Sequence, residues 1–387
     1  MTDKKRKIIR ITTVPSSLGG LLKGQLKFMS QYFEVVGISS SGDGKLDEVS
    51  QQEGIKTHTV EMTRKITPFN DLKALWSLYK IFKQEKPDIV HTHTPKAGTL
   101  GMMAAYLAKV PHRLHTIAGL PLMESTGFKR FVLDSVEKIT YACATRIYPN
   151  SYGLLKFIEE HKYTIPKKLK VIGHGSSNGI DVNYFDPKLY DESFKEDFRK
   201  SLNIDSNDFV FVFVGRIVKD KGIEELVEAF TRVNKDFDSI KLILVGGHEK
   251  QLDPISSETE KCIDNNDSIL AVGWQADVRP FFAISNALAF PSYREGFPNV
   301  VMQACTMGIP SIVSDINGCN ELIRHNENGI IVPVKNINRL ELAMINMLTI
   351  KISETPKEIR NYMIKNFSRE YMHKEILSCY NKLLSES

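Results

Sequence analysis

The chain has 387 residues, 42% hydrophobic and 25% charged, which exceeds one ordinary core and predicts two globular domains. The net charge of +5 is uneven, because residues 1–190 hold 28 Lys and Arg against 17 Asp and Glu (+11) and the remainder holds 23 against 29 (−6). The sequence has no long apolar run and no signal-peptide core, which argues against a membrane-spanning or secreted protein. Its five cysteines are scattered and lack metal-ligand spacing, which argues against a disulfide-linked or metal-binding protein and favours the cytoplasm.

Short β-branched runs alternate with longer helical stretches in the first half, as in βαβ units with a parallel sheet. The predicted strands cover residues 7–14, 34–39, 88–93, 113–117, 146–149 and 169–172. The predicted helices cover residues 21–32, 69–86, 97–108 and 128–144.

The second half repeats this alternation, so we expect an α/β protein with two doubly wound, Rossmann-like domains that bind ligands at the carboxyl ends of their strands, facing a cleft. The predicted strands cover residues 209–214, 241–245, 269–272, 287–290, 311–313 and 330–332, and the helices 223–233, 300–307 and 338–348. The polar stretch 186–208 separates an N-terminal domain (1–190) from a C-terminal domain (191–367). A final helix within 368–387 has a role that periodicity does not settle, and packing back on the first domain is one option.

Two adjacent glycines, Gly19 and Gly20, follow the first predicted strand and precede a helix. Such a turn lets backbone amides approach a phosphate at a helix N-terminus, although glycines at this place often only make the turn. The spacing is not that of the dinucleotide fingerprint, which disfavours a nicotinamide cofactor.

The loop after strand 209–214 carries two cations, with Gly215 before Arg216 and Gly222 after Lys221. An Arg that forks across oxygens and a Lys that supplies a point charge suit a diphosphate. The alternative is a solvated loop with ordinary surface cations.

A third motif follows the buried strand 287–290. It places Glu295 before a turn and a helix. Three kinds of group could then bind the hydroxyls of a sugar or ribose: the acidic side chain, the free backbone amides at the helix start, and a polar side-chain amide on the first turns. The residues that we assign to it are Glu295, Gly296, Phe297, Asn299, Val300 and Gln303.

Together these motifs resemble family 4 glycosyltransferases of the GT-B fold, similar to those that build bacterial capsules and surface polysaccharides. The resemblance spans nearly the whole chain and is most specific in the second half. It implies that Arg216 and Lys221 hold the donor diphosphate, that Glu295 contacts the transferred sugar, and that Trp274 lies by the nucleotide base. It also implies that no metal or other cofactor is needed.

Two positions depart from the pattern of the family. Gln303 stands where most relatives have a Glu for the ribose hydroxyls, and an amide can still accept one hydrogen bond and donate another. Ala118 stands where many relatives have a His, so the catalytic role of that His is not carried over. Four histidines near predicted strand ends are candidates for compensation, although each suits a structural role better; they are His91, His93, His115 and His174, of which we assign His93 and His115 to the acceptor side.

The resemblance further implies a retaining transfer from a nucleotide sugar, with UDP favoured over GDP or ADP, to a lipid-linked sugar acceptor. Two alternatives remain open: a UDP-sugar epimerase of the same fold, and a non-catalytic nucleotide-sugar-binding subunit, which the missing His at Ala118 would suit. Nucleic-acid binding ranks last because the basic half has no aromatic-basic motif.

The basic first half also predicts peripheral association with the inner face of an anionic membrane. The candidate contact is segment 120–132, in which Met123, Phe128 and Phe131 flank Lys129 and Arg130. Apolar residues beside cations can seat in the headgroup layer. The alternative is that these aromatics pack into the core.

Overall fold

A computed structural model describes residues 5–63, 67–120, 122, 125–249, 253–350 and 352–386. The chain forms two compact units: unit 1 comprises Met1–Gly179 and Arg369–Ser387, and unit 2 comprises Ile180–Ser368. In unit 1, 30 Lys and Arg oppose 18 Asp and Glu (+12), which leaves 21 against 28 (−7) for unit 2. The positive charge therefore belongs to unit 1.

The boundary between the units lies at Gly179/Ile180, eleven residues before the expected one at 190/191. The reason is that Ile180 bridges to Ser368, and Phe185 is buried in the core of unit 2. The chain returns to unit 1 at Arg369, where the last helix begins.

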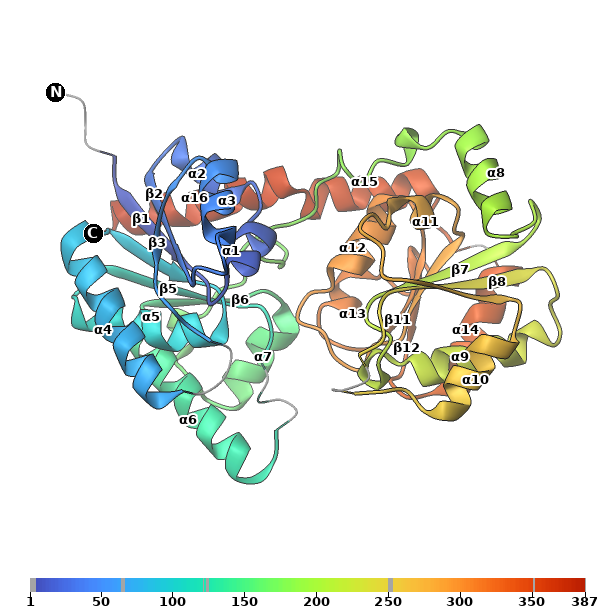
Figure 1. The fold of residues 1–387 in the computed structure, drawn as a ribbon, viewed down its shortest axis with the longest axis horizontal. Helices are drawn as coiled ribbons and strands as arrows, with labels where there is room; N and C mark the ends of the chain where they lie inside the picture. Colours follow the sequence, from blue (N-terminus) through green and yellow to red (C-terminus); the bar gives the residue numbers. More distant parts are fainter. Residues whose placement is uncertain are drawn as a thin grey trace. The chain divides into compact units, whose positions relative to one another are not determined.

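The sheet of unit 1 has six parallel strands in the order β3-β2-β1-β4-β5-β6 (Figure 1). The strands are β1 (Lys7–Ile11), β2 (Glu34–Ser39), β3 (Lys56–Thr59), β4 (Ile89–Thr92), β5 (His112–Ile117) and β6 (Arg146–Pro149). The helices are α1 (Pro15–Leu21), α2 (Gln25–Ser30), α3 (Lys45–Glu53), α4 (Pro68–Glu85), α5 (Pro95–Leu107), α6 (Gly127–Cys143), α7 (Tyr152–Glu160) and α16 (Arg369–Ser385).

Two hydrophobic clusters cover the two faces of this sheet, because successive residues of a strand point to opposite sides. Ile8 belongs to the cluster formed with α1, α2 and α16, and Ile9 to the cluster formed with α4, α5 and α6. Helix α16 contributes the buried side chains of Met372, Ile376 and Leu383. Burial of each stabilises its attachment by roughly 1.5–3 kcal/mol.

The sheet of unit 2 has the order β12-β11-β10-β7-β8-β9. Read from β9, this is the strand order of unit 1 (Figure 1). The strands are β7 (Phe209–Val214), β8 (Ile240–Val245), β9 (Ile269–Gly273), β10 (Ala287–Phe290), β11 (Ser311–Ser314) and β12 (Gly329–Val332). The helices are α8 (Glu192–Ser201), α9 (Ile223–Asn234), α10 (Ser257–Asn265), α11 (Arg279–Ala283), α12 (Asn299–Thr306), α13 (Cys319–Leu322), α14 (Ile337–Thr349) and α15 (Pro356–Phe367). The predicted fold of two doubly wound units is confirmed.

Three local expectations were wrong. The helix predicted at 21–32 is broken by Gly24, whose φ of 78° ends α1 and starts α2. Residues 169–172 form no strand and contribute only the bridge between Leu169 and Ile147. Strand β3 (Lys56–Thr59) was missed because its sequence, Lys-Thr-His-Thr, carries no apolar side chain.

Within the described residues, no helix has the length and hydropathy required to cross a membrane. Nor do the described His, Cys, Asp and Glu side chains form a group of three that could hold a metal ion.

Candidate functional site

The loop after β7 positions the predicted cation Lys221 in unit 2. The 3₁₀ turn η4 (Lys219–Lys221) ends at Gly222, whose φ is 70°. A β-carbon at Gly222 would lie 2.2 Å from the carbonyl oxygen of Pro291, so only glycine permits this approach of the loop to the end of β10. The close approach places Lys221 Nζ 2.5 Å from Glu295 Oε1, with both side chains largely buried.

Glu295 is held from several directions. Its Oε1 also accepts a hydrogen bond from Ser292 Oγ at 3.1 Å. Asn317 Nδ2 donates to the backbone carbonyl oxygens of Glu295 and Gly296, at 2.5 and 3.2 Å. A β-carbon at Gly318 would lie 2.5 Å from the Gly296 carbonyl oxygen. The loop is therefore fixed before any ligand arrives, which preorganises the carboxylate.

Helix α12 begins directly after this loop. Its N-cap is Pro298, which offers no side-chain cap, so no side chain of the cap residue occupies the first backbone N–H groups. Asn299 is exposed, and Val300 and Gln303 are half-buried on the first turns. The side chain of Phe297 packs in the core against Phe367, with ring centroids 5.7 Å apart, so Phe297 can offer a ligand only its backbone.

Arg216 and Trp274 follow two strands of the same sheet, β7 and β9, which are separated by β8. Arg216 follows Gly215 at the end of β7, is half-exposed, and pairs with Glu249 at 2.7 Å. Trp274 follows β9 and is 75% exposed. Since the strands lie in the order β10-β7-β8-β9, the sheet edge runs from Glu295, past Lys221 and Arg216, to Trp274. That row offers, in turn, a carboxylate, two cations and an exposed ring.

The predicted glycine turn of unit 1 is absent. Gly19 and Gly20 lie within α1, not between strand and helix. A β-carbon at Gly19 would lie 2.7 Å from Val49 Cγ2, so this glycine permits close packing of α1 on α3. The expected position of the two glycines between strand and helix is therefore wrong, and packing explains Gly19, whereas their contact with a phosphate stays a prediction.

The two histidines assigned to the acceptor side point to opposite faces of the sheet. His93 follows β4, is buried, and accepts a hydrogen bond from Arg10. His115 lies under α5, where its ring fills the space that a β-carbon at Gly98 would occupy, and Nδ1 contacts Thr92 Oγ1 at 2.8 Å. Burial lowers the pKa of His115 to about 4. His115 is thus a packed, neutral core residue.

The predicted membrane-contact segment is only partly described, and Met123 lies outside the described residues. Phe128 and Phe131, in the first turns of α6, are 81% and 66% exposed and stack on each other, so they are not core residues. Lys129 is also exposed. Arg130 instead braces the helix, donating to Asp134 at 2.8 Å and to Tyr163 Oη at 3.1 Å.

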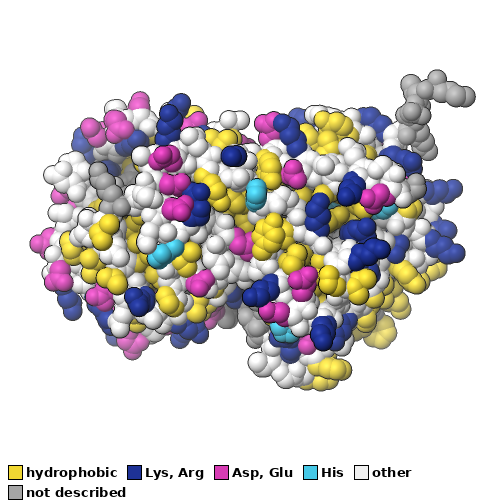
Figure 2. All heavy atoms as spheres, turned by 180° about the vertical axis from the view of Figure 1, so that it is seen from behind, with side chains coloured by type: hydrophobic (Ala, Val, Ile, Leu, Met, Phe, Trp, Pro, Cys, Tyr) yellow, Lys and Arg dark blue, Asp and Glu magenta, His cyan; other side chains and the backbone are white. Residues whose placement is uncertain are grey.

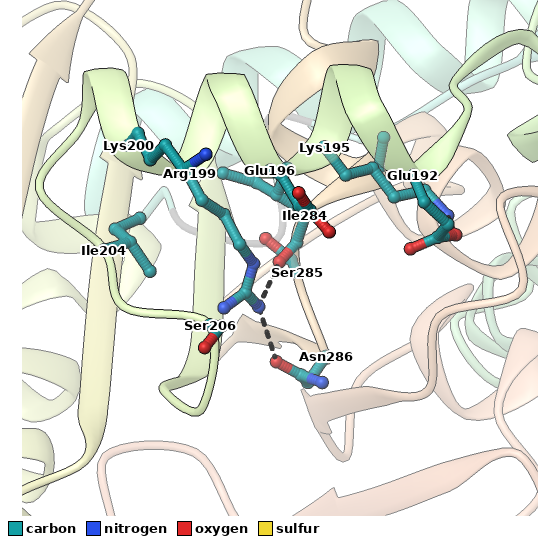
Figure 3. A pocket seen from close by; sticks show the side chains of 11 residues that line it. Glu192, Lys195, Glu196, Arg199, Lys200, Ile204, Ser206, Ile284, Ser285 and Asn286 are labelled. Carbon is teal, nitrogen blue, oxygen red and sulfur yellow. Dashed lines mark hydrogen bonds and ion pairs between the residues drawn. The ribbon is translucent and has the colours of Figure 1, made fainter.

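A cavity of about 530 Å³ lies at the opposite edge of the unit 2 sheet, beside α8 (Figure 3). Arg199 projects into it, and its guanidinium already donates to the carbonyl oxygen of Ile284 at 2.9 Å and to Asn286 Oδ1 at 3.5 Å. Glutamates and lysines of α8 line the rest. The cavity lies near the amino ends of the strands, where doubly wound sheets do not bind their ligands.

Two family models match the sequence: "Glycosyl transferases group 1" over residues 194–367 and "Glycosyl transferase 4-like" over residues 22–151. The capsular polysaccharide biosynthesis glycosyltransferase CapM of Staphylococcus aureus is 34% identical over 99% of both chains. The chain is a family 4 glycosyltransferase. This assignment overturns the alternatives of an epimerase and of a non-catalytic subunit.

A second relative of this glycosyltransferase is an Escherichia coli enzyme named UDP-Gal:alpha-D-GlcNAc-diphosphoundecaprenol alpha-1,3-galactosyltransferase, 30% identical over 95% of this chain and 94% of its own. Among solved structures, HepE of Anabaena, in complex with UDP and glucose, matches with a TM-score of 0.79. It is 17% identical over 97% of this chain and 100% of its own, so it shows the GT-B fold alone.

Three residues of the site were missed by sequence reasoning: Ser292, Glu249 and Asn317. Ser292 lies three residues before Glu295 and directly after the buried strand β10 and Pro291, and this position could have indicated it. Nothing near Glu249 or Asn317 marks them, because each acts on a residue more than twenty positions away.

Proposed function

We propose that the chain transfers a sugar from a UDP-sugar to a lipid-linked sugar acceptor, with retention of the anomeric configuration, in the synthesis of a surface polysaccharide. The observation that carries the donor half is the Lys221–Glu295 pair, a cation and a carboxylate 2.5 Å apart at one sheet edge. A diphosphate needs the first, and the hydroxyls of the sugar attached to it need the second.

Lys221 supplies a point charge to the β-phosphate, where negative charge grows as the sugar departs. Arg216 exchanges Glu249 for phosphate oxygens, an exchange that costs little because the pair is half-exposed. The uncapped start of α12 directs backbone N–H groups to the same anion.

Retention follows if the leaving diphosphate also acts as the base. The acceptor oxygen bonds to the anomeric carbon, the bond from that carbon to the UDP oxygen breaks, and the acceptor proton passes to the β-phosphate on the same face. This route needs no double displacement at Glu295, whose Oε1 is engaged by Lys221 and Ser292. The role of Glu295 is to orient the sugar.

The lipid-linked acceptor and surface-polysaccharide role are inferred from the two relatives, one a capsule enzyme and one whose name specifies a diphosphoundecaprenol-linked sugar. The surface of unit 1 supports a membrane-bound acceptor: exposed Phe128 and Phe131 flank Lys129, and the unit carries a charge of +12. Figure 2 shows basic and apolar side chains interspersed over unit 1. Apolar residues beside cations favour anionic headgroups.

Helix α4 adds a second exposed apolar stripe to unit 1, consisting of Phe69, Leu72 and Trp76. Their spacing of three and four residues places them on one face of the helix. This stripe is not predictable as an exposed surface from the sequence, because amphipathic spacing ordinarily marks the side of a helix that faces the core.

Transfer to N-acetylglucosamine-diphosphoundecaprenol tests this proposal, with radiolabelled UDP-galactose, UDP-N-acetylgalactosamine and GDP-mannose as donors. We expect label to move from a UDP-sugar, and the product to carry an α-linkage. Transfer from GDP-mannose alone, or a β-linked product, would contradict the proposal.

A further inference from the structure

Unit 1 buries a cation without a carboxylate partner. Arg10, on β1, is fully buried, and among the described residues no Asp or Glu forms an ion pair with it. Its guanidinium instead donates to three neutral groups: Gln25 Oε1, His93 Nε2 at 3.0 Å, and Tyr380 Oη at 2.9 Å. Because a guanidinium only donates, it fixes the direction of every hydrogen bond around it.

The first consequence concerns His93. Its Nε2 accepts from Arg10 Nε, so the ring proton resides on Nδ1. That Nδ1 is buried and has no hydrogen-bond partner among the described residues. His93 therefore presents an unused N–H donor.

The second consequence runs through α16. Tyr380 Oη accepts from Arg10 and can donate its own proton to His91 Nδ1, 2.5 Å away. The proton of His91 is then on Nε2 and is donated to Thr116 Oγ1 at 2.7 Å. Thr116 keeps its hydroxyl proton for another acceptor. Two chains of hydrogen bonds thus begin at one buried cation and end in two donors.

Both donors meet at one small cavity. His93 and Thr116 line it, together with Asn150 and Ser177, at the carboxyl ends of β4, β5 and β6. The cavity measures about 10 Å³, which admits one oxygen atom of water size. In the described part of the chain, the Oδ1 of Asn150 and the Oγ of Ser177 are also buried without hydrogen-bond partners.

We propose that this cavity binds a single hydroxyl-type oxygen, which accepts hydrogen bonds from His93 Nδ1 and Thr116 Oγ1 and donates one to Asn150 Oδ1. Water fills the site in the free protein, and a hydroxyl of the sugar acceptor replaces it during transfer. The replacement of this water by an acceptor hydroxyl rests on the proposed function. A phosphate or carboxylate oxygen suits the site less well, because it has no proton for Asn150.

The buried cation also keeps the site neutral. Burial, assisted by Arg10, lowers the pKa of His91 and of His93 well below the ordinary value. His115, on the opposite face, adds to this effect. The two rings therefore act as hydrogen-bonding groups of fixed direction, and not as acids.

The tautomers provide the first test, without any ligand. In the full-length protein labelled with ¹⁵N-histidine, long-range ¹H–¹⁵N spectra at pH 7 should show His93 as the neutral Nδ1–H tautomer and His91 as the neutral Nε2–H tautomer. The exposed His161 serves as the reference signal. An Nε2–H tautomer or a charged ring at His93 would overturn the proposal.

A crystal structure of the free protein provides the second test. It should show one water within 2.7–3.2 Å of both His93 Nδ1 and Thr116 Oγ1. An empty cavity, or a bound anion in its place, would overturn the site. With N-acetylglucosamine-diphosphoundecaprenol bound, a sugar hydroxyl should replace the water. Retention of the water would overturn the acceptor role.

Kinetics provide the third test. Thr116→Val should raise the KM for this acceptor by about 3- to 10-fold with little change in kcat, as expected for one neutral hydrogen bond. Thr92→Val is the matched control, because Thr92 is a buried threonine that faces α5 and His115 instead of the cavity. Equal effects of the two substitutions would mean a purely structural role. If no transfer is found at all, the proposed function fails, and the tautomers and the water still decide the oxygen site.

Discussion

The two units share one strand order, but different kinds of side chain lie at the carboxyl ends of their strands. In unit 2 the edge carries half-exposed or partly buried ions, with Lys221 against Glu295 and Arg216 against Glu249. In unit 1 the carboxyl ends of β4 and β5 present the uncharged side chains of His93 and Thr116 to the small cavity, and the cation Arg10 on β1 is buried and donates to His93. A diphosphate needs ionic partners that can be exchanged, whereas a hydroxyl needs fixed neutral donors and acceptors. The comparison shows that the fold determines where a site lies, whereas the local side chains determine which ligand binds there.

The largest expected effect concerns the ion pairs at the carboxyl ends of the unit 2 strands. Lys221→Ala should lower turnover by roughly thirty- to a thousand-fold, since a charge-assisted contact to a developing phosphate anion is worth about 2–4 kcal/mol. Lys219→Ala is the matched control, because Lys219 is exposed and pairs with Glu224 at 3.4 Å. Steady-state transfer rates decide the matter. Similar rates for the two variants would remove Lys221 from the mechanism.

The folding stability of unit 1 should be more sensitive to acid than that of unit 2. Four buried histidines lie in unit 1, whereas the two histidines of unit 2 are exposed. Burial lowers the pKa of His115 and of His373 to about 4, so the folded state resists protons that the unfolded chain binds near pH 6.5. The stability that their neutral forms contribute is present above pH 6.5 and is lost as the pH falls towards 4. For His115 alone the loss is about 3 kcal/mol.

Hydrogen exchange with mass spectrometry can measure this pH effect unit by unit. Between pH 6.5 and 4, amides of β4 and β5 should lose protection before those of β7 and β10. Equal losses in both sheets would show that the buried histidines do not govern acid stability.

A smaller effect is expected at the proposed membrane-contact surface of unit 1. Lys129→Glu should weaken sedimentation with anionic vesicles by about 1 kcal/mol or slightly more, and added salt should weaken the wild type similarly. Lys382→Glu is the control, because Lys382 is exposed on α16, which covers the other face of the sheet. Arg130 is unsuitable for this test, since it braces α6 through Asp134. Binding that is indifferent to lipid charge would favour a soluble acceptor.

The smallest effect is expected at Gln303. Gln303→Glu should preserve or slightly raise donor affinity, by no more than about 1 kcal/mol or fivefold, if the side chain contacts the ribose hydroxyls. Titration calorimetry with UDP measures this change. A large loss of affinity would show that the pocket is built around the amide.

The sequence predicted the sheet of unit 2 well because its central strands β7 (Phe209–Val214) and β10 (Ala287–Phe290) are continuous apolar runs. Lys221 and Glu295 could each be singled out because a glycine-containing turn follows each of two neighbouring strands, but their contact could not be predicted. Gly19 was misinterpreted, since a glycine that would permit a phosphate turn also permits close helix packing.

The rest of the site depends on contacts between distant parts of the chain. Arg10 meets Tyr380 across 370 positions, and Asn317 holds the backbone of Glu295 from the loop after β11. Neither contact leaves a local pattern in the sequence. Histidines near strand ends were visible, but which face each one occupies depends on strand register, which separates His93 from His115.

The central claim is that Lys221 binds the donor diphosphate, and comparison of UDP with uridine tests it most directly. Titration calorimetry should show that the wild-type chain binds UDP far more tightly than uridine, and that most of this preference disappears in Lys221→Ala while uridine binding is unchanged. A preference for UDP that is as large in Lys221→Ala as in the wild type would contradict the account.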